Sequence, residues 1–184
     1  MSNRIAHALK PASAWNADGA GVASPDDGEI ELASLPLHCG GRLAPATIAW
    51  RLAGAAGAPV VAALGGISAH RRVFDADNPG QGWWPALVGP GLSLDTTRFR
   101  VLGIDYLGGS SGSTGPCAGR TDISPITSRD QAAALLAVCD ALGIAHLHAI
   151  AGASYGGMVG LALAELAPHR VRRVLAISAA HRSN

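Results

Sequence analysis

Apolar and polar positions follow two different periods along the chain. Short stretches carry the alternating or continuous apolar pattern of β-strands, and longer stretches place apolar residues every three or four positions, as helices do. We predict strands over residues 29–37, 46–54, 59–64, 98–105, 145–151 and 171–178, and helices over residues 128–142 and 155–166. Strands that alternate with helices indicate an α/β fold, with a mostly parallel sheet and helices on its faces.

The segments between these elements are rich in turn-forming residues. Residues 67–97 predict a loop with one helical turn, and residues 107–127 predict a long Gly/Ser/Thr loop. Ser128 and Gln131 have the spacing of a capping box at the start of the first helix, and Gly143 is placed to end that helix. Residues 1–28 show little periodicity and predict an irregular leader, which leaves residues 29–184 for the folded domain.

Composition excludes several classes of protein. The 184 residues are 48% hydrophobic and 15% charged, which is too apolar for a disordered chain. A formal net charge of +1 does not create the field that attracts nucleic acid. The sequence has neither the apolar core of a signal peptide nor an apolar run long enough to span a membrane, so we expect a cytoplasmic protein without a membrane partner.

The cysteines do not indicate a disulfide framework or a zinc site. Cys39, Cys117 and Cys139 are odd in number and widely spaced. Cys139 falls on the apolar face of the first predicted helix, where a thiol acts as a small hydrophobic group. No cluster of His, Asp and Glu has ligand spacing, so we predict no metal.

One short motif points to catalysis. Residues 152–156 read G-x-S-x-G and lie where a predicted strand passes directly into a predicted helix. In that context the central Ser154 sits on a sharp turn above the sheet, and small residues two positions before and after it relieve the crowding. We therefore predict that Ser154 is a nucleophile supported by Gly152, Gly156 and Gly157, with the helix N-terminus favouring developing negative charge.

Two other interpretations of the glycine-rich segments fail on residue type. A dinucleotide-binding turn needs G-x-G-x-x-G, and its second glycine position is occupied by Ser154. A phosphate-binding P-loop needs a lysine before its Ser or Thr, and Lys10 is the only lysine in the chain.

An acyl-transferring serine also needs two N–H donors for the oxyanion, and an acid and a base. The donors are expected from Tyr155, which follows the nucleophile, and from the turn at Leu64-Gly65-Gly66. In α/β-hydrolases the acid and then the base follow the serine in the chain. Glu165, His169 and His181 follow Ser154, but the first two belong to the next helix or its end, and His181 would break the usual order.

Two more histidines precede the motif. His146 and His148 alternate along the preceding strand, as packing or edge residues do. We therefore predict that neither the acid nor the base is present in this chain.

Longer motifs resemble one family. These motifs are L-G-G-I-S-A-H at residues 64–70, W-W-P-A-L-V-G-P-G at 83–91, L-G-G-S-S-G-S-T-G-P at 107–116, P-I-T-S-R-D at 125–130 and G-A-S-Y-G-G-M at 152–158. Together they resemble the homoserine O-acyltransferases of the α/β-hydrolase superfamily, including the serine O-succinyltransferases. The resemblance runs from about Glu29 to the end and implies an α/β-hydrolase fold that stops before the lid and the last strands. Ser110 and Ala153 stand where many members have Cys and Gly, and both changes keep a small residue.

The resemblance also implies a reaction. An acetyl or succinyl group would pass from acyl-CoA, a co-substrate, to Ser154 and then to the hydroxyl of L-homoserine or L-serine, in methionine or cysteine biosynthesis. By position, Leu64 and Tyr155 would be the oxyanion donors. The full-length form would be a homodimer whose second half carries the acid and base, and the 184 residues alone would be inactive. A carboxylesterase, or an inactive fragment that serves only as an interaction module, stays open as an alternative.

Overall fold

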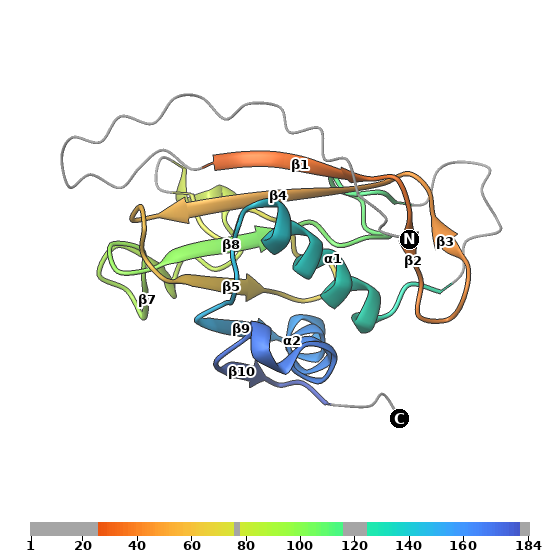
Figure 1. Ribbon diagram of the computed structural model, residues 1–184. Helices are drawn as coiled ribbons and strands as arrows, with labels where there is room; N and C mark the ends of the chain where they lie inside the picture. Colours follow the sequence, from red (N-terminus) through yellow and green to blue (C-terminus); the bar gives the residue numbers. More distant parts are fainter. Residues whose placement is uncertain (1–25, 76–77, 116–124, 181–184) are drawn as a thin grey trace.

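The computed structural model describes residues 26–75, 78–115 and 125–180. Its main feature is a six-stranded sheet with the strand order β1-β4-β8-β5-β9-β10 (Figure 1). The sheet strands are β1 (Asp26–Leu32), β4 (Ala46–Gly54), β8 (Arg100–Ile104), β5 (Val60–Leu64), β9 (Ala149–Ala153) and β10 (Val174–Ile177). β1, β4 and β8 pair antiparallel, whereas β8, β5, β9 and β10 run parallel, so the predicted mostly parallel sheet is confirmed.

Two helices cover one face of this sheet. They are α1 (Ser128–Ala141) and α2 (Tyr155–Leu166), which pack against each other on the near side in Figure 1. The apolar residues beneath them form the main core, with side chains from β4, β5, β8, β9 and both helices; its largest fully buried members include Ile48, Leu64, Leu102, Leu135, Ile150 and Leu163. β5 is apolar throughout because both of its faces are covered.

The other face is covered by the segment between β5 and β8. This segment holds the 3₁₀ turn η1 (Pro79–Gln81) and the short strands β6 (Val88–Gly89) and β7 (Leu94–Asp95). Trp83 and Trp84 stack with ring centroids 5.0 Å apart and pack against a smaller cluster that contains Phe74 and Val101. The predicted loop with one helical turn is therefore confirmed, with two short strands added.

Three smaller elements lie outside the main sheet. β2 (Leu35–Pro36) and β3 (Arg42–Leu43) form a hairpin around a turn that contains Gly40 and Gly41, and the 3₁₀ turn η2 (Pro168–Arg170) follows α2. β1 starts at Asp26, inside the segment expected to be an irregular leader. Residues 1–25 and His181 lie outside the described residues. Across the described ranges, no helix is long and apolar enough to cross a membrane.

The start of α1 differs from the predicted capping box. Thr127, not Ser128, is the N-cap, and its partner is Asp130, not Gln131. A carboxylate oxygen of Asp130 accepts the Thr127 N–H at 2.7 Å, and its other oxygen accepts the His38 N–H at 2.6 Å. The capping box thus lies one residue earlier than predicted. Its carboxylate, Asp130, also binds the backbone of the turn between β2 and β3. Gly143, with φ +69°, ends the helix as predicted.

β10 is the free edge of the sheet among the described residues. Leu175 is 58% exposed and Ile177 is 37% exposed, whereas their β9 neighbours Ala151 and Ala153 are half-buried and Ala63 of β5 is buried. Leu166, the last residue of α2, is also exposed, and α2 packs against β10. This end of the sheet therefore presents apolar side chains to solvent.

Candidate active site

Ser154 lies on the single-residue turn between β9 and α2. Its backbone has φ 53° and ψ −119°, a conformation that non-glycine residues rarely adopt and that costs about 1–3 kcal/mol. The surrounding hydrogen bonds hold this geometry: the Ser154 N–H donates to the Ile177 carbonyl at 2.9 Å, and the Ser154 carbonyl accepts from Gly157 at 3.0 Å. The residue is exposed, as a nucleophile that must meet a substrate has to be.

The flanking glycines are required by close approaches of the backbone. A Cβ on Gly152 would lie 2.3 Å from the Gly156 carbonyl oxygen, and one on Gly156 would lie 2.2 Å from the Leu64 carbonyl oxygen. A Cβ on Gly157 would lie 2.5 Å from the Cβ of Ala179. The glycines thus let the backbones of the turn, the helix and the end of β5 pack in close contact. This is the local geometry that the sequence motif predicts.

The two predicted oxyanion donors come from elements that meet at this point. Tyr155 is the first residue of α2, where an N–H has no partner within the helix. Leu64 is the last residue of β5 and lies opposite Gly152 in the register with β9. The Gly156 N–H donates to the Gly65 carbonyl at 2.9 Å, so the turn after β5 is hydrogen-bonded to the turn that carries Ser154. The roles of Leu64 and Tyr155 as donors remain predictions.

Tyr106 is a residue of this site that sequence reasoning missed. Its hydroxyl donates to the Gly65 carbonyl at 2.9 Å, and its ring meets the Tyr155 ring edge-on with centroids 5.2 Å apart. Burial raises the pKa of Tyr106 well above its usual range, so the hydroxyl stays a donor. Its position directly after the β8 segment was the available signal, because parallel strands β5, β8 and β9 bring their carboxyl ends to one edge.

The Gly/Ser/Thr loop is attached to α1 by a helix side chain and to β4 by two of its own side chains. The buried amide of Gln131 donates to the Leu107 carbonyl at 2.8 Å and accepts the Leu107 N–H at 2.9 Å. Ser113 Oγ accepts the Ala49 N–H at 3.0 Å, and Thr114 Oγ1 accepts the Thr47 N–H at 2.7 Å. These bonds continue the ladder beside β4, so the motif that begins at Leu107 has a structural role here.

A network of charged side chains, anchored on the buried Asp105 and Arg51, fixes two loops at the carboxyl edge of the sheet. The Asp105 carboxylate accepts the backbone N–H of Arg71 at 2.6 Å, its guanidinium at 2.5 Å and the Gly112 N–H at 2.8 Å. Asp27 accepts from Arg71 at 2.8 Å and from Arg51 at 2.5 Å. Burial opposes ionisation of Asp27, but the hydrogen bonds from the two arginines outweigh it and hold the pKa of Asp27 below its usual range.

The candidate acids and bases do not gather around Ser154. Glu165 is exposed and forms an ion pair with Arg129, and His169 lies in η2 beyond the far end of α2. His146 and His148 precede β9, at the end of the strand opposite Ser154. The Ser154 hydroxyl makes no hydrogen bond to any residue in the part of the chain that the structure describes, and that part holds no cluster of His, Cys, Asp and Glu suited to a metal.

Comparisons with known proteins agree with this fold. Residues 64–184 match the family model described as alpha/beta hydrolase fold. A homoserine O-succinyltransferase from Xanthomonas campestris pv. campestris is 42% identical over 159 residues, which are 85% of this chain and 40% of that protein. A serine O-succinyltransferase from Litchfieldella anticariensis is 44% identical over 121 residues, which are 61% of this chain and 33% of that protein.

Solved structures show the same relation. The crystal structure of homoserine O-acetyltransferase from Staphylococcus aureus superposes with a TM-score of 0.78 at 21% identity, over 88% of this chain and 49% of that one. The chain thus spans about half, or less, of the proteins that it matches. The family match, the strand order and the strained serine turn at Ser154 together show that this chain belongs to the alpha/beta hydrolase fold family.

Proposed function

We propose that this chain is the nucleophile-bearing part of a homoserine or serine O-acyltransferase. In the proposed reaction an acetyl or succinyl group moves from acyl-CoA to the side-chain hydroxyl of L-homoserine or L-serine. The observation that carries the proposal is the Ser154 turn, with φ 53° and a helix N-terminus directly after it. The relatives named as homoserine and serine O-succinyltransferases support the choice of acceptor.

The first half-reaction forms an acyl-serine. Ser154 Oγ loses its proton to a base and attacks the thioester carbonyl, and the resulting oxyanion accepts hydrogen bonds from the backbone N–H groups of Tyr155 and Leu64. When the tetrahedral intermediate collapses, the C–S bond breaks and coenzyme A leaves as its thiol after taking the proton back. The strained turn keeps Oγ above the sheet, so no reorganisation of the serine is needed at the moment of attack.

The second half-reaction repeats these steps with a different nucleophile. The hydroxyl of homoserine or serine loses its proton to the base and attacks the acyl-serine, and the bond to Ser154 Oγ breaks as the ester product forms. Water must be excluded for transfer to win over hydrolysis. The product would feed methionine or cysteine biosynthesis, a cytoplasmic process that needs only small-molecule substrates.

The base and its acid partner are proposed to come from outside these 184 residues. Glu165 and His169 lie on or beyond α2, away from the turn, and Ser154 has no described hydrogen-bond partner for its hydroxyl. We therefore expect the isolated 184-residue chain to show no appreciable turnover. Steady acyl transfer by that chain alone would contradict this expectation.

The proposal is tested with the protein encoded by the complete gene. It is incubated with acetyl-CoA or succinyl-CoA, with and without L-homoserine or L-serine, and free thiol is measured over time. We expect sustained thiol release only when an acceptor is present, and its loss in a Ser154→Ala variant. Thiol release at the same rate without an acceptor would instead indicate an esterase-type hydrolase. Neither thiol release nor acyl transfer with any pair would favour the interaction-module alternative.

A further inference from the structure

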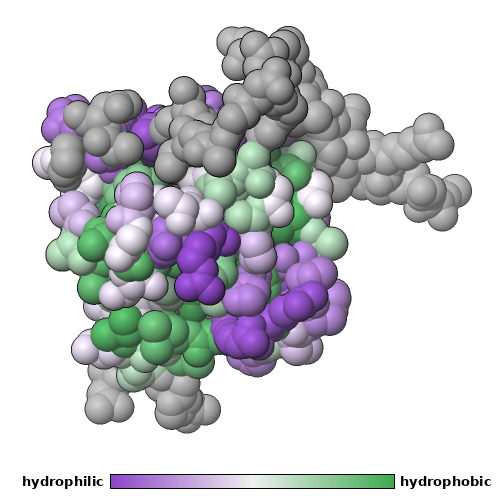
Figure 2. Space-filling model, turned by 90° about the vertical axis from the view of Figure 1, so that its left-hand side faces the viewer, coloured by the Kyte–Doolittle hydropathy of each residue, from purple (hydrophilic) through white to green (hydrophobic). Residues whose placement is uncertain are grey.

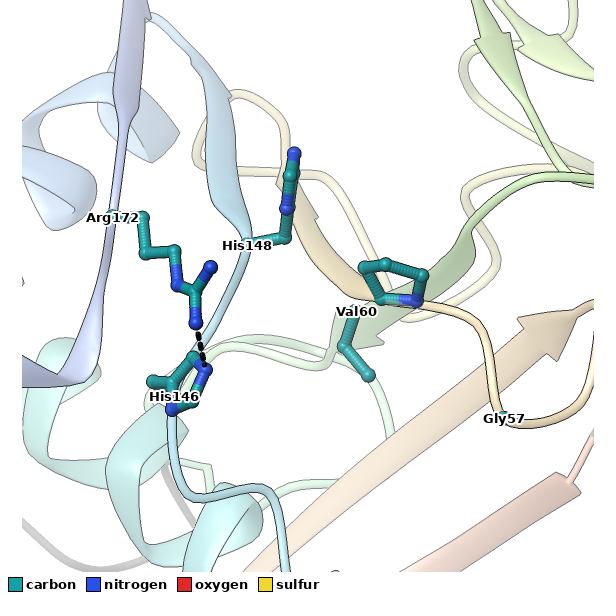
Figure 3. A pocket seen from close by; sticks show the side chains of 6 residues that line it. Gly57, Val60, His146, His148 and Arg172 are labelled. Carbon is teal, nitrogen blue, oxygen red and sulfur yellow. Dashed lines mark hydrogen bonds between the residues drawn. The ribbon is translucent and has the colours of Figure 1, made fainter.

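A second pocket lies at the end of the sheet opposite Ser154. It has a volume of about 230 Å³ and is lined by Gly57, Pro59, Val60, His146, His148 and Arg172 (Figure 3). The His148 N–H donates to the Val60 carbonyl at 2.8 Å, so the pocket sits where β5 and β9 begin. Ser154 lies six positions after His148 along extended chain, a distance of roughly 20 Å. The pocket is therefore separate from the site at Ser154.

One wall of this pocket consists of histidine and arginine side chains. An N–H of the Arg172 guanidinium lies 2.8 Å from Nε2 of His146, and Figure 3 shows this bond with His148 on the other side of Arg172. Arg173 reaches Nε2 of His148 in the same way at 3.3 Å. A guanidinium has five donors and no acceptor, so each Nε2 accepts and each imidazole keeps its proton on Nδ1. Each arginine thus donates one N–H to a histidine, and its other N–H groups are left for a ligand.

The positive charge of this wall is not neutralised by nearby carboxylates. Arg170, two residues before Arg172, forms an ion pair with Asp140 at 2.6 Å. Arg172 and Arg173 have no carboxylate partner in the ranges that the structure describes. Figure 2 looks onto this end of the molecule and shows hydrophilic side chains gathered in its lower right part. The Arg172 guanidinium therefore lines the pocket without a described carboxylate to balance its charge, and an anion in the pocket would supply that charge.

The facing wall is short and apolar. Pro59 and Val60 line the pocket together with Arg172, and Figure 3 shows Val60 across the pocket from Arg172 and His146. Gly57, at the rim, has φ +70° and open space where a side chain would stand. The pocket therefore combines free guanidinium donors on one side with room for an uncharged carbon group on the other.

From this arrangement we propose that the pocket binds a phosphate group, either as free phosphate or on a small phosphate monoester. Such a group carries about −1.5 to −2 charges at neutral pH and three or more acceptor oxygens, which match the spare donors of Arg172 in the pocket and the positive charge of Arg173 behind His148. A monoester would place its carbon group against Pro59 and Val60. This proposal does not depend on the acyltransferase function, because the pocket shares no residue with the Ser154 site.

The test is a calorimetric titration of the whole chain at constant ionic strength. Inorganic phosphate and phenyl phosphate are the probes, and acetate at the same ionic strength is the reference. We expect saturable binding of both phosphates, tighter for phenyl phosphate, and at least tenfold weaker binding in Arg172→Gln. Arg129→Gln removes one charge from α1, outside the pocket, and should leave the dissociation constant within twofold.

A second pair of variants tests the pocket without removing any existing contact. Asp and Asn both tolerate the left-handed conformation of Gly57 and have the same shape. Gly57→Asp should weaken phosphate binding severalfold more than Gly57→Asn, because only the carboxylate repels the ligand. Absence of saturable binding, equal weakening by Arg172→Gln and Arg129→Gln, or equal affinities in the two Gly57 variants would overturn the proposal. Tighter binding of inorganic phosphate than of phenyl phosphate would overturn the role of the apolar wall.

Discussion

A methyl group added at Gly156 tests whether the serine turn depends on its close contact with β5. In Gly156→Ala the new Cβ would lie 2.2 Å from the Leu64 carbonyl oxygen and 2.7 Å from the Gly65 carbonyl oxygen. Both atoms belong to the backbone, so relief requires α2 or the end of β5 to move. Overpacking of this kind costs about 1–3 kcal/mol, and losing the 2.9 Å bond from the Gly156 N–H to Gly65 adds about 0.5–1.5 kcal/mol.

We therefore expect Gly156→Ala to lower the free energy of unfolding by about 2–4 kcal/mol. The measurement is urea unfolding followed by circular dichroism, with the slope against urea compared between variants. Gly66→Ala is the matched control, because a Cβ at Gly66 meets nothing within 4 Å and the variant should stay within about 0.5–1 kcal/mol of the wild type. Equal stability of the two variants would refute the argument that this contact shapes the turn.

Three further predictions follow from buried or ionised groups. Gln131→Leu should lower the free energy of unfolding by roughly 2–4 kcal/mol, because it leaves the buried N–H and carbonyl of Leu107 without partners, and urea unfolding measures it. Iodoacetamide at pH 8 should alkylate the exposed Cys39 in the native protein but not the buried Cys139, because burial raises the pKa of Cys139 to about 12. Mass spectrometry of the digested protein measures this, and rapid modification of the Cys139 peptide would contradict it. Asp27 has a lowered pKa in the folded state, so its stabilising effect is complete above its ordinary value of 3.8 and is lost as the pH falls through the folded value. The stability difference between wild type and Asp27→Asn should therefore be constant at neutral pH and shrink under acid, and a difference that grows under acid would be inconsistent with the arginine contacts.

The elements that local patterns determine were predicted well. The helix over residues 155–166 and the turn at Ser154 were confirmed because the motif, the apolar strand before it and the helical periodicity after it all favour one structure. The six strands of the sheet were found for the same reason, although their ends shifted: the last strand was predicted over residues 171–178 and spans Val174–Ile177. Strand ends depend on hydrogen bonds to neighbours that the sequence does not display.

The features that distant contacts determine were missed or misplaced. Ser128-Gln131 and Thr127-Asp130 both fit the local capping pattern, and the choice between them depends on Asp130 binding the backbone of His38 and Gln131 binding the backbone of Leu107. The position of Tyr106 just after β8 was a signal in the sequence, but its bond to Gly65 depends on β8 lying beside β5, which the sequence does not display.

The ionic contacts follow the same rule. The pair of Arg71 with Asp105 joins residues 34 positions apart, which no short-range pattern encodes. Local propensity therefore located the strained turn at Ser154, and tertiary packing determined what supports it.

The most direct test of the account is to trap the acyl-serine. The protein from the complete gene is mixed with acetyl-CoA or succinyl-CoA without an acceptor, quenched in acid and digested, and the peptide that contains Ser154 is examined by mass spectrometry. The account predicts one acyl group on Ser154, which disappears when L-homoserine or L-serine is added before the quench and is absent in Ser154→Ala. Acyl transfer that proceeds equally well in Ser154→Ala, or an acyl group found only on another residue, would contradict it.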